Sequence, residues 1–158
     1  MSQVLPVTPV KIPILTGLAI RAVVRVAHVV SKQKPARLRR FLQAASRGSR
    51  PGVYTEVSRA RNEILTVSTT CRGSSACLVR STAVALLCRL RGSWADWCVG
   101  VMAEPPFRAH AWVEAEGRIV DEVAERGELM ELFRVERQNQ TTSPRSVPTF
   151  TAKGGDTR

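Results

Sequence analysis

The chain has 158 residues, of which 44% are apolar, and it carries a formal net charge of +11 at pH 7. This length suits one compact domain, and the apolar fraction excludes a wholly disordered chain. The charge favours an acidic partner. Residues 1–50 hold ten Lys or Arg and no acid, but they contain a single aromatic residue for stacking, Phe41. Nucleic-acid binding is therefore not expected.

Residues 1–10 are predicted to be a flexible N-terminus, ahead of a strongly apolar segment at residues 12–30. That segment is nearly long enough to cross a bilayer, but Arg21 and Arg25 lie in its interior, four residues apart on one helical face. It therefore predicts an amphipathic helix, which either packs on the domain or makes peripheral contact with a membrane or partner surface. No signal peptide is recognised in the sequence.

Three more helices are expected before the chain changes character. A second basic helix begins at Pro35 and ends near Gly48, so residues 11–50 form a basic pair of helices. The third has apolar residues at helical spacing, namely Val57, Ala60, Ile64 and Val67. The fourth covers residues 76–92, is apolar along its length and fits a buried helix, with Ser74 and Ser75 placed to cap its start.

After the fourth helix the pattern favours strands. Short runs rich in Val and Trp predict a small antiparallel meander, at residues 94–102, 109–115 and 118–124. Residues 127–136 fit either a short helix or a last strand. Residues 138–158 are rich in Ser, Thr, Pro and Gly without periodicity, which predicts a disordered tail. Helices first and strands afterwards indicate an α+β domain over residues 11–137.

The four cysteines contain one candidate nucleophile. They form no C-x-x-C pair, so neither a zinc site nor any other metal or cofactor is predicted, and free thiols in the cytoplasm are expected. Cys77 lies in the first turn of the fourth helix, where the positive end of the helix dipole stabilises a thiolate. Cys71 precedes the helix, Cys88 lies deep in its last turns, and Cys98 lies in a predicted core strand.

A cysteine nucleophile needs a base, and the chain has two histidines. His28 lies among Val and Arg on the first helix, where a surface or packed role is expected. His110 lies on a predicted strand, and the alternation of a strand puts Trp112 and Glu114 on its side. His110 is therefore the candidate base, although a structural role for it in the sheet is also possible.

An acid to orient the imidazole is expected from the next hairpin. Glu116-Gly117 suits a tight turn. With a two-residue turn, Asp121 faces Trp112 on the His110 side, and with a three-residue loop Glu122 faces His110. Either register brings a carboxylate to the histidine, and the two stay open because a slip of one residue exchanges the faces of a strand.

In this order, the motifs resemble a known family. They are Cys77-Leu78-Val79-Arg80-Ser81, Gly100-Val101, Pro106-Phe107, His110-Ala111-Trp112-Val113-Glu114 and Gly117-Arg118. The set is similar to the transglutaminase-like leader peptidases of lasso-peptide biosynthesis, in the form in which the B protein's peptidase half is a separate chain. The resemblance covers most of residues 20–123, and its specific motifs fall in residues 71–122.

The resemblance implies a papain-like, transglutaminase-like fold and a cysteine peptidase that removes the leader from a ribosomally made precursor. Cys77 corresponds to the nucleophile and His110 to the base. The family's acid, usually an Asp twelve residues after the histidine, falls on Glu122, with Asp121 as the alternative. The resemblance also implies three partners: the leader region of the precursor, a separate leader-recognition protein and a macrolactam-forming cyclase.

Four more residues are considered for the substrate. Trp112, Phe107 and Trp97 line the cleft or belong to the core, and Arg80 meets an acidic group of the leader or a partner, or lies on a solvated helix face. Two other functions use the same fold: a non-catalytic interaction module, and an acyl transferase that passes the acyl group to an amine.

Overall fold

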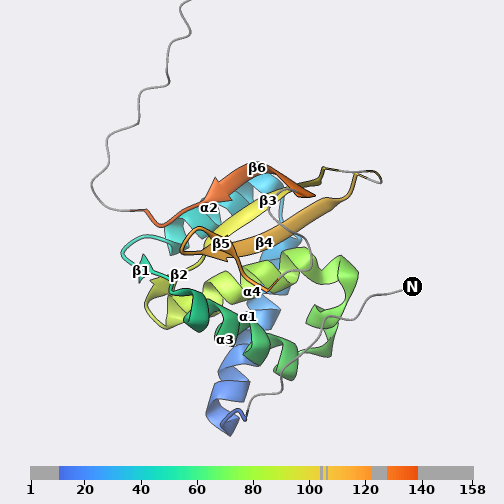
Figure 1. The fold of residues 1–158 in the computed structure, drawn as a ribbon. Helices are drawn as coiled ribbons and strands as arrows, with labels where there is room; N and C mark the ends of the chain where they lie inside the picture. Colours follow the sequence, from blue (N-terminus) through green and yellow to red (C-terminus); the bar gives the residue numbers. More distant parts are fainter. Residues whose placement is uncertain (1–10, 104, 106, 122–127, 139–158) are drawn as a thin grey trace, which may run out of the picture.

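The helical first part of the sequence and its strand-rich later part correspond to two parts of the fold, the helices and the sheet. The computed structural model describes residues 11–103, 105, 107–121 and 128–138. Within these residues the helices come first and the antiparallel sheet last, as the α+β prediction requires (Figure 1). The predicted flexible N-terminus at residues 1–10, and the predicted tail beyond residue 138, lie outside the described residues.

The four helices lie close to their predicted positions, and their bounds are α1, Ile14–Ser31; α2, Pro35–Ala45; α3, Tyr54–Val67; and α4, Cys77–Leu90. Pro35 is the first residue of α2, where its missing N–H has no intrahelical partner to lose. Two short 3-10 turns connect α3 to α4, η1 (Thr69–Arg72) and η2 (Ser74–Ala76). The predicted cap of α4 by Ser74 or Ser75 is wrong, because Ala76 is the residue that precedes α4 and no side chain caps the helix.

Helix α4 is the centre of the molecule. Every residue from Arg80 to Cys88 is buried, as expected for a helix that is apolar on all sides. In Figure 1, α4 runs between the sheet and the pair α1 and α3. One core joins these layers, and its largest members include Trp94, Trp97 and Leu42.

The main sheet has the strand order β5-β4-β3-β6 and is antiparallel throughout, with bounds β3, Asp96–Met102; β4, Ala109–Ala115; β5, Arg118–Ile119; and β6, Leu129–Val135. The strand prediction at residues 109–115 is confirmed, and the ambiguous segment at residues 127–136 contains β6. Two further short strands, β1 (Arg50–Pro51) and β2 (Ser93–Trp94), pair in parallel, and β2 follows the C-terminal end of α4.

The hairpin between β4 and β5 has the two-residue turn. Glu116 and Gly117 both have positive φ, 52° and 71°, which is the requirement of a type I′ turn. Glu114 pairs with Ile119 and Ala115 with Arg118. However, β5 ends at Ile119, much earlier than the strand predicted at residues 118–124. Among the described residues, no strand pairs with β4 on this side beyond that point. We call this side of β4 its open edge, and it positions the candidate site.

A bulge in β6, at Leu132, lies opposite the part of β3 that pairs with the candidate base. The register between β3 and β6 shifts between Val99 and Gly100, and Gly100 pairs with His110 on β4. A Cβ placed on Gly100 would lie 2.1 Å from the carbonyl oxygen of Met130. Only glycine lets the two strands approach so closely at this position.

Replacing Gly100 should therefore destabilise the fold. We expect Gly100→Ala to lower the free energy of unfolding by about 1–3 kcal/mol, because β3 and β6 must separate to admit the methyl group. Urea denaturation followed by circular dichroism measures this. The matched control is Gly17→Ala on α1, where the nearest atom is 3.9 Å away and a gain of up to about 1 kcal/mol is expected. Equal stabilities of the Gly100 variant and the parent protein would contradict the close approach.

Candidate active site

The candidate nucleophile is the first residue of the central helix. Cys77 begins α4 directly after η2, so it lies at the positive end of the helix dipole. All four cysteines are in the described part of the chain and none is in a disulfide. Cys71, Cys88 and Cys98 are buried, whereas Cys77 is only partly buried. Of the four thiols, Cys77 is therefore the one that a substrate can reach.

The open edge of β4 is where Cys77 meets the sheet. The N–H of Val120 donates to the carbonyl oxygen of Val113 at 3.1 Å, so the backbone groups of Val113 point toward β5. In a strand the residues two apart share this direction. The N–H of Ala111 therefore points to the same edge, beyond the end of β5. There it donates a hydrogen bond to the sulfur of Cys77.

The imidazole of His110 completes the contact, because it also donates a hydrogen bond to the Cys77 sulfur. Burial alone would raise the pKa of the Cys77 thiol. The hydrogen bonds from His110 and Ala111, together with the positive charges of His110 and Arg80, outweigh burial, and the pKa of Cys77 lies below the ordinary thiol value. A thiolate facing an imidazolium is the state in which a cysteine attacks carbonyl carbons.

The two other cysteines with shifted pKa values differ from Cys77 in direction. Burial raises the pKa of Cys88 to about 12 and also raises that of Cys98. Neither of them has a histidine beside it to offset the loss of water. Of these three thiols, Cys77 is therefore the one whose surroundings favour the thiolate.

The imidazole ring of His110 packs against the indole ring of Trp112, two residues further along β4. The two rings are nearly parallel, at 15°, with centroids 6.2 Å apart. The indole N–H of Trp112 donates to Glu114 at 3.1 Å, and Arg134 on β6 donates to the other oxygen of Glu114 at 2.9 Å. Because Glu114 is only 2% exposed, this chain of contacts fixes the ring that packs against the base.

The position of Arg80 differs from both expectations for this residue. It was expected to meet an acidic group of a substrate or to lie on a solvated face, but it is 3% exposed and points inward. Its guanidinium donates to the carbonyl oxygens of Cys71 and Gly73, at 3.1 and 3.3 Å. Arg80 thereby ties down the turns before α4, and its charge helps to lower the pKa of Cys77.

The structure describes one of the two candidate acids, Asp121. Asp121 accepts hydrogen bonds from the hydroxyl groups of Tyr54, at 3.1 Å, and of Ser58, both on α3. Its φ of 47° turns the chain out of the sheet. The pairing of β4 with β5 has already ended at Ile119, so counting along the hairpin does not place Asp121 against Trp112. Glu122 lies outside the described residues, and its role as the acid stays a prediction.

The aromatic candidates divide between core and surface. Trp97 is fully buried, and its indole N–H donates to Ser81 on α4 at 3.0 Å, so it is a core residue. Trp112 is buried behind His110. Phe107 is 71% exposed and lies three residues before His110. Of the three, Phe107 is the one whose side chain is available to a peptide.

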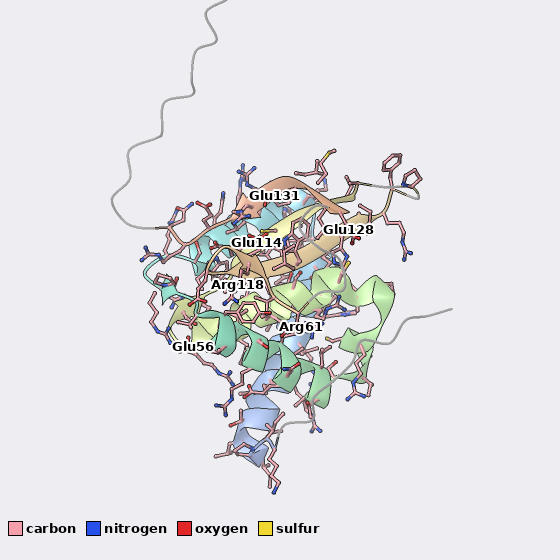
Figure 2. All side chains as sticks on the ribbon, viewed as in Figure 1. Glu56, Arg61, Glu114, Arg118, Glu128 and Glu131 are labelled. Atoms are coloured by element: carbon pink, nitrogen blue, oxygen red, sulfur yellow. The ribbon has the colours of Figure 1, made fainter. Side chains whose placement is uncertain are left out.

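Three potential metal ligands, Cys98, Glu114 and Glu131, come together on the outer face of the sheet, with ligand atoms within 4.8 Å of one another. Figure 2 labels the two glutamates, which reach this face from β4 and β6. Arg134 already donates to both of them, at 2.9 Å to Glu114 and 2.7 Å to Glu131. The raised pKa of Cys98 keeps its thiol protonated. A guanidinium therefore occupies the place of a cation in this cluster.

Sequence reasoning missed two parts of this arrangement. The N–H of Ala111 carries no signal of its own, because its direction depends on where β5 ends. Arg134 lies in a segment whose secondary structure was ambiguous, so its pairing with Glu114 could not be foreseen. By contrast, the inward direction of Arg80 had a signal, since it lies three residues after Cys77 and so on the same helical face.

Comparison with known proteins places the chain in a family. A family model described as the transglutaminase-like superfamily matches residues 20–134. This range includes Cys77, His110, Asp121 and Glu122. No curated protein and no solved structure gives a match.

The lowered pKa of Cys77 predicts a distinct alkylation profile. Iodoacetamide should modify Cys77 first in the native protein, with a rate that falls as the pH drops through the folded-state pKa, because the thiolate is lost there. Mass mapping of peptides at each pH gives the midpoint, which is expected below the ordinary thiol value. His110→Gln should raise the midpoint, and His28→Gln, which removes the exposed histidine of α1, should leave it unchanged. A midpoint unaffected by His110→Gln would disprove the contact.

Trp112→Phe should separate support of the base from general packing. It keeps a ring beside His110 but removes the donor to Glu114, at an expected cost of about 1–3 kcal/mol in the free energy of unfolding. The matched variant is Trp94→Phe, because the buried indole of Trp94 donates to Val135 at 2.9 Å. Both variants should be destabilised in urea denaturation, while Trp112→Phe alone should shift the alkylation midpoint of Cys77. The same shift in Trp94→Phe would argue against support by Trp112.

Proposed function

This chain belongs to the transglutaminase-like superfamily, and we propose that it is a cysteine peptidase that removes the leader peptide from a lasso-peptide precursor. Members of the superfamily are typically cysteine-dependent enzymes, and they include cysteine peptidases and acyltransferases. The observation that carries the proposal is the contact of the Cys77 sulfur with His110 and the Ala111 N–H at the start of α4. The motifs that resemble the lasso leader peptidases support this substrate.

The proposed reaction begins with attack of the Cys77 thiolate on the carbonyl carbon of the peptide bond between leader and core. The negative oxygen of the tetrahedral intermediate lies at the positive start of α4, where backbone N–H groups stabilise it. His110 gives its proton to the leaving amine as the carbon–nitrogen bond breaks, which leaves a thioester on Cys77. His110 then takes a proton from water, and hydrolysis of the thioester restores the thiolate.

The acid of the proposed triad is Glu122, with Asp121 as the alternative. The hydrogen bonds of Asp121 to Tyr54 and Ser58 support this order, because they engage both of its carboxylate oxygens. In the same proposal Asp121 anchors the end of the hairpin to α3. The guanidinium of Arg118 lies over the ring of Tyr54, 4.2 Å from its centroid, and adds to that anchor.

We place the reaction in the cytoplasm, with a separate leader-recognition protein that holds the leader and a macrolactam-forming cyclase that consumes the freed core. The cation-rich first 50 residues support an acidic surface on one of these partners. Phe107, exposed three residues before His110 in the sequence, is the candidate contact for the residues around the cleavage site.

Cleavage of the precursor tests the proposal directly. The chain is incubated with precursor peptide and recognition protein, and masses are read over time. Free leader and core are expected, with Cys77→Ala reducing the rate by at least about 10³-fold and Cys88→Ala leaving it nearly unchanged. An amine adduct of the precursor would instead show acyl transfer, and an unaltered precursor under conditions where Cys77 alkylates normally would show a non-catalytic module.

The assignment of the acid has its own test in the same assay. Glu122→Gln should lower the cleavage rate more than Asp121→Asn does, because the orienting carboxylate holds the imidazole in the productive tautomer. Asp121→Asn should act mainly on stability, through the contacts to α3. A larger loss of rate in Asp121→Asn at equal stability would transfer the role to Asp121.

A further inference from the structure

One face of α1 carries apolar side chains that nothing in the described structure covers. Ile14, Leu15 and Leu18 are 84%, 81% and 54% exposed, and Val26 and Val29 on the next turns are 47% and 62% exposed. From Leu15 onward they follow each other at intervals that keep them on one helical face. The opposite face packs into the core through Ile20, Val23 and Ala27. The exposed face is therefore a second apolar surface of the helix.

This surface is unusual for the chain. It holds five of the eleven large apolar side chains that are exposed among the described residues, and contiguous exposed apolar patches mark interaction sites. Within the described part of the chain, α1 is also the one helix that is long and apolar enough to cross a membrane. Its inner face is packed on α4 and α3, however, so the helix can lie on a surface without leaving the fold.

Positive charge lies beside this surface. Arg21 and Arg25 are exposed next to the apolar side chains. Near the N-terminal end of α1, Lys11 lines a cleft of about 410 Å³. The three arginines of that cleft, Arg50, Arg59 and Arg91, are paired with Glu56 or Glu63. The helix itself contains no acid. An apolar face bordered by cations fits a surface that is apolar inside and anionic at its rim.

We propose that α1 docks on an anionic lipid surface. The apolar arc from Ile14 to Val26 is wider than the seam of a helix pair, and its most exposed residues are at the N-terminal end of α1, which extends beyond α3 at the bottom of Figure 1. Such an end enters the boundary between headgroups and acyl chains, while Arg21 and Arg25 reach the phosphates. A second copy of the chain on this face would set arginine against arginine.

The docked position leaves the chemistry free. Helix α4 lies between α1 and β4 (Figure 1), so a membrane beneath α1 does not cover the strand that carries His110. Membrane docking would concentrate the chain on a surface, and it places no demand on the Cys77 contact. The inference therefore stands apart from the proposed peptidase activity.

Vesicle binding tests the inference with the full chain. Vesicles of phosphatidylcholine with phosphatidylglycerol should sediment the protein, and vesicles of phosphatidylcholine alone should sediment little of it. The double variant Leu15→Ser/Leu18→Ser should lower the partition coefficient at least about 10-fold, because both side chains are buried only when docked. Arg21→Gln and Arg25→Gln should each lower it about 5-fold and weaken its dependence on salt.

The controls are exposed leucines elsewhere. Leu90→Ser and Leu132→Ser replace side chains that are 69% and 63% exposed, and they should leave vesicle binding unchanged. All of these variants should keep the circular dichroism and the Cys77 alkylation of the parent. Failure to bind the anionic vesicles overturns the inference, as does equal binding by the Leu15→Ser/Leu18→Ser variant. A third outcome would assign the face to a protein instead. In that outcome the parent does not bind vesicles, and the Leu15→Ser/Leu18→Ser variant loses a homodimer or a complex with the recognition protein.

Discussion

The site depends on one junction, the hydrogen bonds that join the start of α4 to the open edge of β4. The sulfur of Cys77 lies at that edge, beyond Ile119, the last residue of β5. Its two donors, the Ala111 N–H and the His110 imidazole, come from adjacent residues of one strand. Because β4 is hydrogen-bonded to β3 along its whole length, neither donor can move without the sheet. The thiolate is thus stabilised by groups that are already fixed before a substrate arrives.

Buried charges hold α4 in the position that this junction requires. At its start, Arg80 binds the carbonyl oxygens of the preceding turns. At its end, Arg91 pairs with Glu63 of α3, which also binds Arg59 at 3.1 Å. Glu63 is buried, and removal of one partner from a buried ion pair is strongly destabilising. These contacts act as positional constraints at the two ends of a helix whose middle is held by apolar packing and by the hydrogen bond from Trp97 to Ser81.

The sequence predicted those parts of the site that follow from local patterns. The alternation at residues 109–115 defines β4, and the Gly-Ser-Ser break before an apolar run gives the start of α4, so Cys77 and His110 could both be placed. The end of β5 at Ile119 could not, because the hydrogen bonds of Asp121 to Tyr54 and Ser58 on α3 join residues that are far apart in the sequence. The inward turn of Arg80 was missed for a related reason. An acidic partner or a solvated face was expected for its charge, whereas its partners are backbone carbonyls.

The chemistry at Cys77 and the choice of the reaction product are separate questions. In the proposed mechanism, peptide hydrolysis and acyl transfer would both pass through a thioester on Cys77, and both would need His110 first as an acid and then as a base. They differ in the nucleophile that reaches the thioester, water or an amine. In that mechanism the junction of α4 with β4 prepares the thioester and does not select its acceptor. The superfamily includes both cysteine peptidases and acyltransferases, which fits a junction that serves either product.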